Sequence, residues 1–504
     1  MRNQFFPFLW VLLMIHGPFP CCTTPDPQCN FSGSQNIRFA TYYSNNMVLQ
    51  RSPQRAIVWG YSTHSNTNLT IKIDDVIVLK TISYFHPVIN ASIWTVKLPA
   101  KEAGGPHVIT VQSSLSTIKL VNVLFGDVWI CSGQSNMQFT TMMAFNGSNE
   151  AKGSIHYPHI RVFTTAYMAA NQPEYDVKCA LEQWSVASPE AIASSNWMYF
   201  SAICWMYGRR LYEEHRIPIG LVSSTYGGTP IEGWSSPDVL KKCPETKISF
   251  TKSSFWNAMI HPLLNMTIHG IIWYQGESNA QHPKQYSCLF PAMVADWRQK
   301  FNEGSYNQTS STFPFGFVQL APYHNLGFPA LRWAQTASKG YVPNEKLPNV
   351  FMAVAMDLPD PTSPYGSVHP RYKEDIADRL IKGLKSLDYN TINNAYQGPF
   401  PQTFQMRNGE IEIQYNRVLD ILSHKGFQIS CAKHNECRNS MWLSIESSTN
   451  ENQTSIFLSS NVTCYGERVC DIRYAWQESP CPLKKCPIYS QGTNLPAAPF
   501  WHRF

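Results

Sequence analysis

The sequence predicts an α/β protein whose central, mostly parallel sheet is flanked by β domains. Between residues 121 and 392, continuous apolar stretches alternate with helical patterns, which is typical of a parallel sheet covered by helices on both faces. On both sides of this region the stretches are short, rich in β-branched residues and separated by turn residues. We therefore expect an N-terminal β domain over residues 23–120, an α/β domain over 121–392 and a C-terminal β domain over 393–504.

The stretches that predict strands follow one another in three groups. The first comprises AIVWGYS, LTIKIDDVIVL, SIWTVKLPA and HVITVQSS, and its partial alternation predicts a β-sandwich or jelly-roll-like module. The second comprises VLFGDVWICSG, IPIGLVSSTYGG, HGIIWYQGES, FPFGFVQL and VFMAVAMD, with helices predicted from Ala202 to Glu214 and from Tyr372 to Leu387. The third comprises GEIEIQYN, SIFLSS and CDIRYAW, in a region rich in cysteine.

The first 22 residues have the features of a secretory signal peptide. Arg2 provides the positive charge, and FFPFLWVLLMI provides an apolar run too short to span a membrane. We expect disulfides among the cysteines near the C-terminus, namely Cys431, Cys437, Cys464, Cys470, Cys481 and Cys486. We expect glycosylation at the sequons of Asn30, Asn68, Asn90, Asn146, Asn265, Asn307, Asn452 and Asn461. The sequence thus predicts a secreted or lysosomal glycoprotein without a membrane span.

Composition and spacing argue against two other classes of function. The 504 residues carry a formal net charge of only +6, and their Lys and Arg form no long runs, so no nucleic-acid partner is expected. The spacings in CAKHNEC and CPLKKC differ from the paired spacing of zinc sites, so no metal site is expected.

Four polar or glycine-rich clusters follow strands of the predicted central sheet. Because ligands bind at the carboxyl ends of parallel strands, we expect the four clusters to converge in space. The clusters are GQSNM with Ser135, SSTYGGTPIEGW with Gly227 and Gly228, WYQGESN with Gln275, and MDLPDPTSPYGSVHP with Asp357, Asp360 and His369.

Together these clusters contain the parts that ester hydrolysis requires. Ser135 can attack a carbonyl carbon, and His369 can take the proton and return it to the leaving alcohol. Backbone N–H groups at Gly227 or Gly228 and the amide of Gln275 can face the oxyanion. Each residue alone has an ordinary structural explanation, such as a helix cap for the serine and a turn for the glycines. Their occurrence together, after strands of one sheet, favours a hydrolase.

The serine cluster differs from the G-x-S-x-G turn of ordinary α/β-hydrolases, because Met137 stands at the second glycine position. The motifs NNMVLQRSP, GDVWICSGQSNMQF, PIGLVSSTYGGTPIEGWSS, WNAMIHPL, WYQGESN, FMAVAMDLPD and SVHPRYK instead resemble the sialate O-acetylesterase family of SGNH hydrolases, over nearly the whole chain. The resemblance implies an SGNH-hydrolase-like (flavodoxin-like) domain between the β domains. It implies hydrolysis of O-acetyl esters of sialic acids, notably 9-O-acetyl esters, through an acetyl-serine intermediate and without a metal or organic cofactor.

The resemblance also implies roles for individual residues. Ser135 becomes the nucleophile and His369 the base, while the N–H of Ser135, a glycine of the second cluster and Gln275 form the oxyanion hole. An ordinary imidazole pKa of ~6.5 leaves only about 3% of the base neutral at pH ~5, which predicts weakened activity in acid.

One expected residue is missing from the histidine cluster. SGNH enzymes usually carry an aspartate three residues before the histidine, and here this position is Gly366. Asp357 or Asp360 is available to orient the ring of His369, and a backbone carbonyl is a third possibility. His261, in WNAMIHPL, is the alternative base.

Substrate recognition is predicted from residue types near the motifs. The expected partners are O-acetylated sialic acids and sialoglycoconjugates, whose carboxylate suits an arginine such as Arg332 or Arg371. Trp234 is a candidate for stacking on the sugar, whereas core packing is the favoured interpretation of Tyr274. Two other functions stay open at this point, an esterase for another acetylated carbohydrate such as xylan and an inactive sialoglycan-binding protein.

Overall fold

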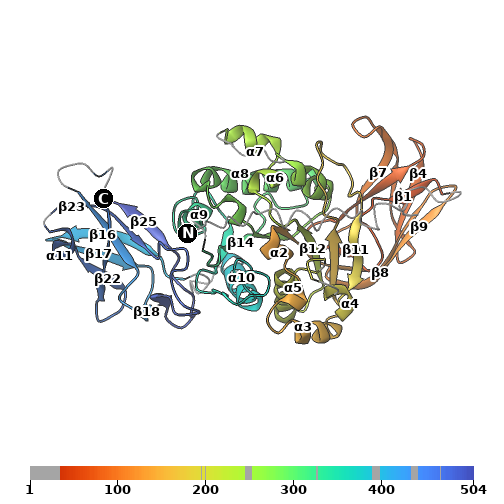
Figure 1. The fold of residues 1–504 in the computed structure, drawn as a ribbon. Helices are drawn as coiled ribbons and strands as arrows, with labels where there is room; N and C mark the ends of the chain where they lie inside the picture. The colour runs from red at the N-terminus through yellow and green to blue at the C-terminus, as the bar shows by residue number, and fades with distance from the viewer. Residues whose placement is uncertain are drawn as a thin grey trace, which may run out of the picture.

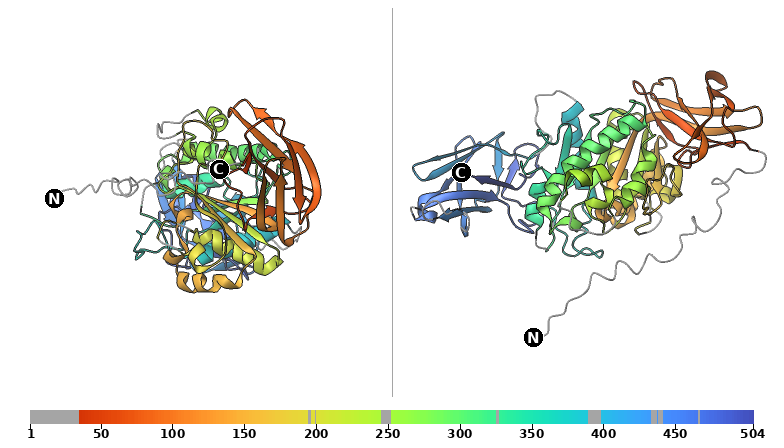
Figure 2. Two further views of the ribbon diagram at one scale, coloured as in Figure 1. Left: turned by 90° about the vertical axis from the view of Figure 1, so that its right-hand side faces the viewer. Right: turned by 90° about the horizontal axis from the view of Figure 1, so that it is seen from above.

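The protein consists of an α/β region with a β-rich region at each end (Figure 1, Figure 2). The predicted signal peptide over residues 1–22 and the predicted boundary at 392/393 lie outside the described residues. The computed structural model describes residues 35–193, 196–198, 200–244, 252–324, 327–388, 398–432, 437, 441–465 and 467–504.

The central sheet contains the five strands that the sequence predicts, β9 (Thr117–Gly133), β12 (Ile219–Thr225), β13 (Gly270–Tyr274), β14 (Phe315–Gln319) and β15 (Val350–Val354), and two that it did not predict, β10 (Ile160–Thr165) and β11 (Ala180–Val186). Along the path of the sheet β11 is antiparallel to β10, and each of the other neighbouring pairs is parallel. From β9 the chain passes through β10 and the edge strand β11, returns to β12 beside β9, and then continues to β13 on the other side of β9, so the strand order reverses at β9. Such a reversal is where ligands bind in open α/β sheets. The order is β11, β10, β12, β9, β13, β14 and β15.

Helices cover both faces of this sheet (Figure 1). α5 (Ala202–His215) and α10 (Lys373–Asp388) pack against each other on one face, and α8 (Pro283–Gly304) and α9 (Phe328–Gln335) lie on the other. The two helices predicted from the sequence correspond to α5 and α10. Shorter helices are α2 (Ser135–Gln138), α3 (Gly147–Gly153), α4 (Pro189–Ile192), α6 (Ile231–Trp234) and α7 (Pro237–Lys242).

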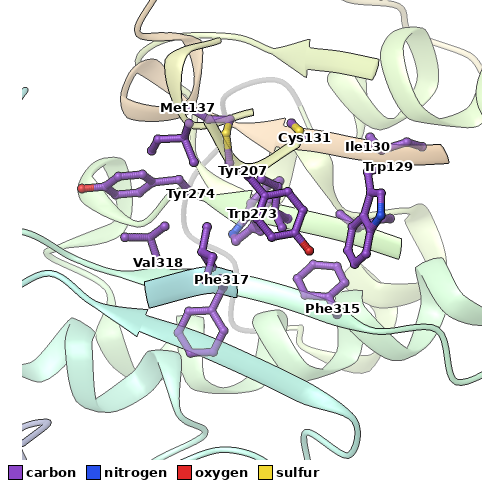
Figure 3. Close-up of a cluster of buried hydrophobic side chains, with 14 of the residues drawn as sticks. Trp129, Ile130, Cys131, Met137, Tyr207, Trp273, Tyr274, Phe315, Phe317 and Val318 are labelled. Atoms are coloured by element: carbon purple, nitrogen blue, oxygen red, sulfur yellow. The ribbon is translucent and has the colours of Figure 1, made fainter. Parts of the chain in front are cut away.

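The core around these strands is built from large apolar side chains. Burying each of these side chains contributes about 1.5–3 kcal/mol to the stability of the fold. The close-packed core therefore holds the carboxyl ends of the strands in fixed positions. Figure 3 shows Trp129 and Ile130 of β9, Trp273 and Tyr274 of β13, Phe315, Phe317 and Val318 of β14, Met137 of α2 and Tyr207 of α5 in one cluster.

The N-terminal β region shares a strand with the central sheet. β9 has 17 residues and runs through the predicted boundary at 120/121. Its first part pairs with β8, and its last part lies between β12 and β13. The strands before it are β1 (Ile37–Phe39), β2 (Val48–Gln50), β3 (Ile57–Ser62), β4 (Asn68–Ile73), β5 (Val76–Ile82), β6 (Tyr84–His86), β7 (Ala91–Lys97) and β8 (Gly104–Gln112).

The C-terminal region consists of small antiparallel sheets, with order β16-β17-β22-β21, β20-β19-β23-β25 and β18-β24. Alternate residues of β17 are buried, as expected for sheets that cover a core on one face. The strands are β16 (Pro401–Arg407), β17 (Glu410–Tyr415), β18 (Leu419–Ile421), β19 (Phe427–Ala432), β20 (Trp442–Ile445), β21 (Ser447–Thr449), β22 (Ser455–Ser459), β23 (Arg468–Tyr474), β24 (Ile488–Ser490) and β25 (Phe500–Arg503).

Five disulfides link the described residues, and the six cysteines predicted to pair do so among themselves. A bridge that the sequence did not predict joins Cys131, at the end of β9, to Cys204 in α5. These bridges are consistent with a protein of the secretory pathway. In the described ranges, no helix has the length and apolarity needed to cross a membrane. The other pairs are Cys243–Cys288, Cys431–Cys464, Cys437–Cys470 and Cys481–Cys486.

The predicted glycosylation sites lie mostly on the surface. Asn265 is half-buried, Asn30 lies outside the described residues, and the side chain of Asn461 is not among those described. An exposed amide is accessible to glycan transfer, and glycosylation at the exposed sites stays a prediction. The exposed asparagines are Asn68, Asn90, Asn146, Asn307 and Asn452.

Candidate active site

Ser135 lies at the carboxyl end of β9, where the chain turns into α2. Gly133 has φ +141°, and a Cβ atom there would come within 2.1 Å of the carbonyl oxygen of Tyr274. Only glycine therefore allows the ends of β9 and β13 to approach so closely. The N–H of Gln134 donates to that same carbonyl oxygen at 3.0 Å, which fixes the turn before the serine.

The structure brings Ser135 and His369 together although 234 positions separate them. Oγ of Ser135 lies 2.9 Å from Nε2 of His369. Nδ1 of the ring lies 2.7 Å from the carbonyl oxygen of Tyr365, which can only accept a hydrogen bond. Nδ1 therefore carries the proton in the neutral ring, and Nε2 accepts from the serine hydroxyl. This is the arrangement that a nucleophile and its general base require.

Neither predicted aspartate orients His369. Asp357 is buried and accepts two hydrogen bonds from Arg379, at 2.6 and 2.9 Å. Asp360 accepts from Nε and Nη2 of Arg371, at 2.7 and 2.9 Å. The prediction of an orienting carboxylate at these two positions is therefore wrong, because each is neutralised by its own arginine. The backbone alternative is the arrangement found.

The surroundings of His369 change its proton affinity. Burial, and to a smaller extent the charge of Lys373, lowers the pKa of His369 to about 4, against the opposing effect of the hydrogen bond to the Tyr365 carbonyl. The imidazole is therefore neutral down to about pH 5, whereas the sequence predicted protonation near pH ~6.5.

The second cluster lies beside Ser135, but its two glycines differ. The N–H of Gly227 donates to Oε1 of Gln138 at 2.8 Å, so it is not available to an oxyanion. Gly228 is exposed and has φ +73°. Among the described residues, no acceptor occupies the N–H of Gly228 or of Ser135. These two N–H groups are therefore available as oxyanion donors.

Gln275 does not supply the predicted amide donor. It is fully buried, and its Nε2 donates to Gln134, Thr229 and Asn279 at 3.2, 3.1 and 2.7 Å. The acceptor on Thr229 is a backbone carbonyl, so the amide cannot be reversed. Both N–H groups of Gln275 are thus committed, and the residue supports the turn before Ser135 instead.

The two predicted substrate-binding residues are parts of the core. Trp234 is 0% exposed, and its Nε1 donates to Thr229 at 2.8 Å. Arg332 is also 0% exposed and donates to four backbone carbonyls, among them those of Gln477 and Glu478. The prediction of sugar contacts was wrong for both, because the residue type suits a sugar but the side chain is inaccessible. Arg332 instead ties α9 to the C-terminal region.

The three remaining candidates from the sequence, Tyr274, His261 and Arg371, have contacts that indicate structural roles. Tyr274 is 0% exposed, as the core-packing interpretation predicted. Nδ1 of His261 lies 2.8 Å from the carbonyl oxygen of Glu174, away from Ser135. Arg371 forms the ion pair with Asp360. Within the described ranges, no three His, Cys, Asp or Glu side chains gather in a group that could hold a metal ion.

The aromatic side chain of Trp197 lies beside His369 and was not predicted from the sequence. The ring of Trp197 packs edge-on against His369, with ring centroids 5.0 Å apart, and is half-exposed. Its φ is +67°, an uncommon conformation for a bulky residue, and Nε2 of Gln138 donates to its carbonyl oxygen at 2.9 Å. The side chain of Gln138 therefore links the backbone of Trp197 to that of Gly227. No local sequence signal marks Trp197, because it lies outside the strand-end clusters.

Two family models match the chain. The model described as "Carbohydrate esterase, sialic acid-specific acetylesterase" matches residues 125–369, and the model described as "Sialate O-acetylesterase C-terminal domain" matches residues 402–504. The first match begins in β9 and ends at His369, so it contains the strand ends described above.

Curated relatives and a solved structure resemble nearly the whole chain. Sialate O-acetylesterase of Homo sapiens is 40% identical over 494 residues, which cover 93% of each chain. The enzyme of the same name from Rattus norvegicus is 40% identical over 521 residues, which cover 93% of this chain and 94% of the relative. A carbohydrate acetylesterase from Xanthomonas citri superposes with a TM-score of 0.76 at 24% identity, covering 92% of this chain and 99% of that one, and so shares its fold.

Proposed function

The chain belongs to the sialate O-acetylesterase family, and we propose that it hydrolyses O-acetyl esters of sialic acids, notably 9-O-acetyl esters, at Ser135. The observation that supports Ser135 as the reacting residue is the 2.9 Å contact between its Oγ and Nε2 of His369. The substrates are O-acetylated sialic acids and the sialoglycoconjugates that contain them.

The reaction proceeds in two steps. In the first, Oγ of Ser135 attacks the acetyl carbonyl carbon while Nε2 of His369 takes its proton, and the proton then passes to the departing sugar oxygen as the C–O bond breaks. In the second, water gives a proton to Nε2 of His369 and attacks the acetyl carbonyl carbon. The bond between this carbon and Oγ of Ser135 then breaks, Oγ takes the proton back from His369, and acetate is released.

The N–H groups of Ser135 and Gly228 face the oxyanion in this mechanism. Both belong to the turns that follow β9 and β12, and both lack an acceptor in the described part of the chain. Losing one such donor costs about 10²–10³ in kcat in well-studied hydrolases. Gly227 and Gln275 act behind them, through Gln138 and Gln134.

The orienting group of His369 in this mechanism is the carbonyl oxygen of Tyr365, so the site is a Ser–His dyad. The carbonyl fixes the tautomer but carries no full charge. A dyad of this kind is chemically sufficient, because hydrolases that lose the acid of their triad retain part of their activity.

The fold suits an SGNH-type catalytic domain. Numbered from β9, the strands β12, β9, β13, β14 and β15 give the order 2-1-3-4-5 of flavodoxin-like sheets, with β10 and β11 added at one edge. We place this domain over residues 121–392, between a sandwich or jelly-roll-like domain over 23–120 and a disulfide-rich β domain over 393–504. The disulfides and sequons favour a secreted or lysosomal location.

Two alternative functions make different predictions. An esterase for another acetylated carbohydrate would release acetate from that substrate faster than from 9-O-acetylated sialic acid in side-by-side assays. An inactive sialoglycan-binding protein would release none, and the contact between Ser135 and His369 argues against it.

Replacement of Ser135 by alanine tests the proposal. The Ser135→Ala variant should lose at least about 10³-fold in acetate release, because no other group can form the acyl intermediate. Its thermal unfolding should match that of the wild type, since the hydroxyl contributes a single hydrogen bond. Acetate release at the wild-type rate by a folded variant would disprove the assignment.

A further inference from the structure

A buried ammonium group lies behind the loop that carries His369. Lys373, the first residue of α10, is 0% exposed, and its Nζ donates to Oδ1 of Asn136 at 2.6 Å. The ammonium also lies over the rings of Phe139 and Tyr274, 4.5 and 5.4 Å from their centroids. Burial of an ammonium ion costs several kcal/mol unless it is compensated. A buried lysine this close to the site therefore needs a physical explanation.

The amide of Asn136 joins three parts of the site. Asn136 directly follows Ser135 and is 1% exposed. Its Nδ2 donates to the carbonyl oxygen of Val368 at 2.8 Å and to Oε1 of Glu277 at 2.6 Å. Because a carbonyl oxygen only accepts and an ammonium only donates, the orientation of this amide is fixed. The serine helix, the histidine loop and the turn after β13 are thereby connected.

We propose that Lys373 and Asn136 are positioning residues for His369: Lys373 holds the amide of Asn136, and this amide holds the backbone next to the histidine. They act on the backbone of the histidine loop and not on the ring itself, since Asn136 contacts the carbonyl oxygen of Val368 and the Tyr365 carbonyl contacts Nδ1 of His369. The inference rests on the proposed roles of Ser135 and His369. The histidine is then fixed from two sides, by Tyr365 at Nδ1 and by Asn136 at the neighbouring carbonyl.

The ammonium has a second effect, which is electrostatic. Burial lowers the pKa of Lys373 to about 7, against the opposing charges of Glu277 and Asp360, so the side chain carries its positive charge in acid. There this charge disfavours the imidazolium form and helps to keep His369 neutral. The charged and titratable groups that face Lys373 are Glu277 from the turn after β13, Asp360 from the loop after β15, the phenol of Tyr274 and His369 itself. Asp360 is already paired with Arg371, so Glu277 is the main opposing charge.

Two substitutions of Lys373 separate its charge from its hydrogen bond. Lys373→Met removes both, whereas Lys373→Gln removes the charge and retains an amide donor. In each variant the acid limb of the kcat/KM profile should move upward by about 1 pH unit. The ratio of kcat/KM at pH 5 to that at pH 7.5 should therefore fall by about twofold, since a pKa that moves from about 4 to about 5 halves the neutral fraction of His369 at pH 5. Lys373→Met should in addition lose about 10-fold or more at pH 7.5, because the histidine loop is less well placed.

Lys382→Met is the matched control, since Lys382 is an exposed lysine of the same helix. It should keep the wild-type pH profile. A loss that is equal at all pH values in a folded Lys373 variant would mean a structural role only, and would overturn the inference.

The wild-type protein provides a test that does not depend on the folding of any variant. NMR of ¹³C-labelled histidine should show the ring of His369 titrating below pH ~5, and titration near ~6.5 would overturn the inference. Ser135→Ala is measured in the same series. Activity in that variant would refute the proposed function, whereas an inactive Ser135→Ala with unshifted Lys373 profiles refutes only the role of Lys373.

Discussion

Nδ1 of His369 donates to the carbonyl oxygen of Tyr365 at 2.7 Å, in the position where a hydrolase of the usual type presents a carboxylate. The carbonyl comes from the turn that leads to the histidine, four residues before it. The ring is thus oriented by its own loop. Among the described residues no carboxylate faces Nδ1, so burial is the main influence on the pKa of His369.

The pH dependence of activity follows from this environment. The base works in its neutral form, and burial lowers the pKa of His369 to about 4. As the pH falls, kcat/KM should therefore stay nearly constant from pH 7 to about 5 and decline only close to pH 4. Initial rates of acetate release across this range, corrected for irreversible unfolding, measure the profile. A decline centred near pH ~6.5 would show that His369 is solvated like a free imidazole.

Asp360 should contribute little to catalysis. Asp360→Asn keeps an oxygen that can accept from the backbone N–H of Arg371, which Asp360 now binds at 3.0 Å. We expect kcat to change by less than about tenfold, compared with a loss of about 10⁴ when the acid of a true triad is changed to asparagine. A loss of about 10⁴ in steady-state kinetics would instead show that Asp360 acts as the acid of a catalytic triad.

Gly227 should tolerate no side chain, because it packs against the nucleophile. A Cβ atom there would lie 3.0 Å from Oε1 of Gln138 and 3.4 Å from Cβ of Ser135. Gly227→Ala should therefore lower kcat/KM by about 10-fold or more, by displacing the serine or the oxyanion loop. Gly153→Ala is the control, since a Cβ atom at Gly153 meets nothing within 4 Å. Equal kinetics of the two variants would mean that the spacing around Ser135 is unimportant.

The sequence was sufficient to predict five strands of the central sheet and the pairing of Ser135 with His369, but not the edge strands β10 and β11. Long apolar runs predict buried parallel strands, and Ser135 and His369 each follow such a run. The fold class and the location of the site could therefore be predicted from the local sequence pattern. The orienting group could not be predicted, because the positions of Asp357 and Asp360 in the chain do not reveal which arginine each meets.

The other errors have the same origin. Gln275, Trp234 and Arg332 have suitable chemistry, but tertiary packing commits their polar groups elsewhere. Asn136 and Lys373 stand in motifs that the sequence analysis quoted, yet 237 positions separate them. Their contact appears only when β9 and α10 come together in the folded protein.

We propose that Ser135 is the acylated nucleophile and that His369 activates it without an acidic partner among the described residues. The most direct test of this proposal is mass spectrometry of the peptide containing Ser135 after incubation with an organophosphonate ester, in the wild type and in Asp357→Asn and Asp360→Asn. We expect phosphonylation of Ser135 in all folded forms, at rates within about tenfold of each other. An unmodified Ser135 in a fully inhibited enzyme, or labelling abolished by either aspartate substitution, would contradict the proposal.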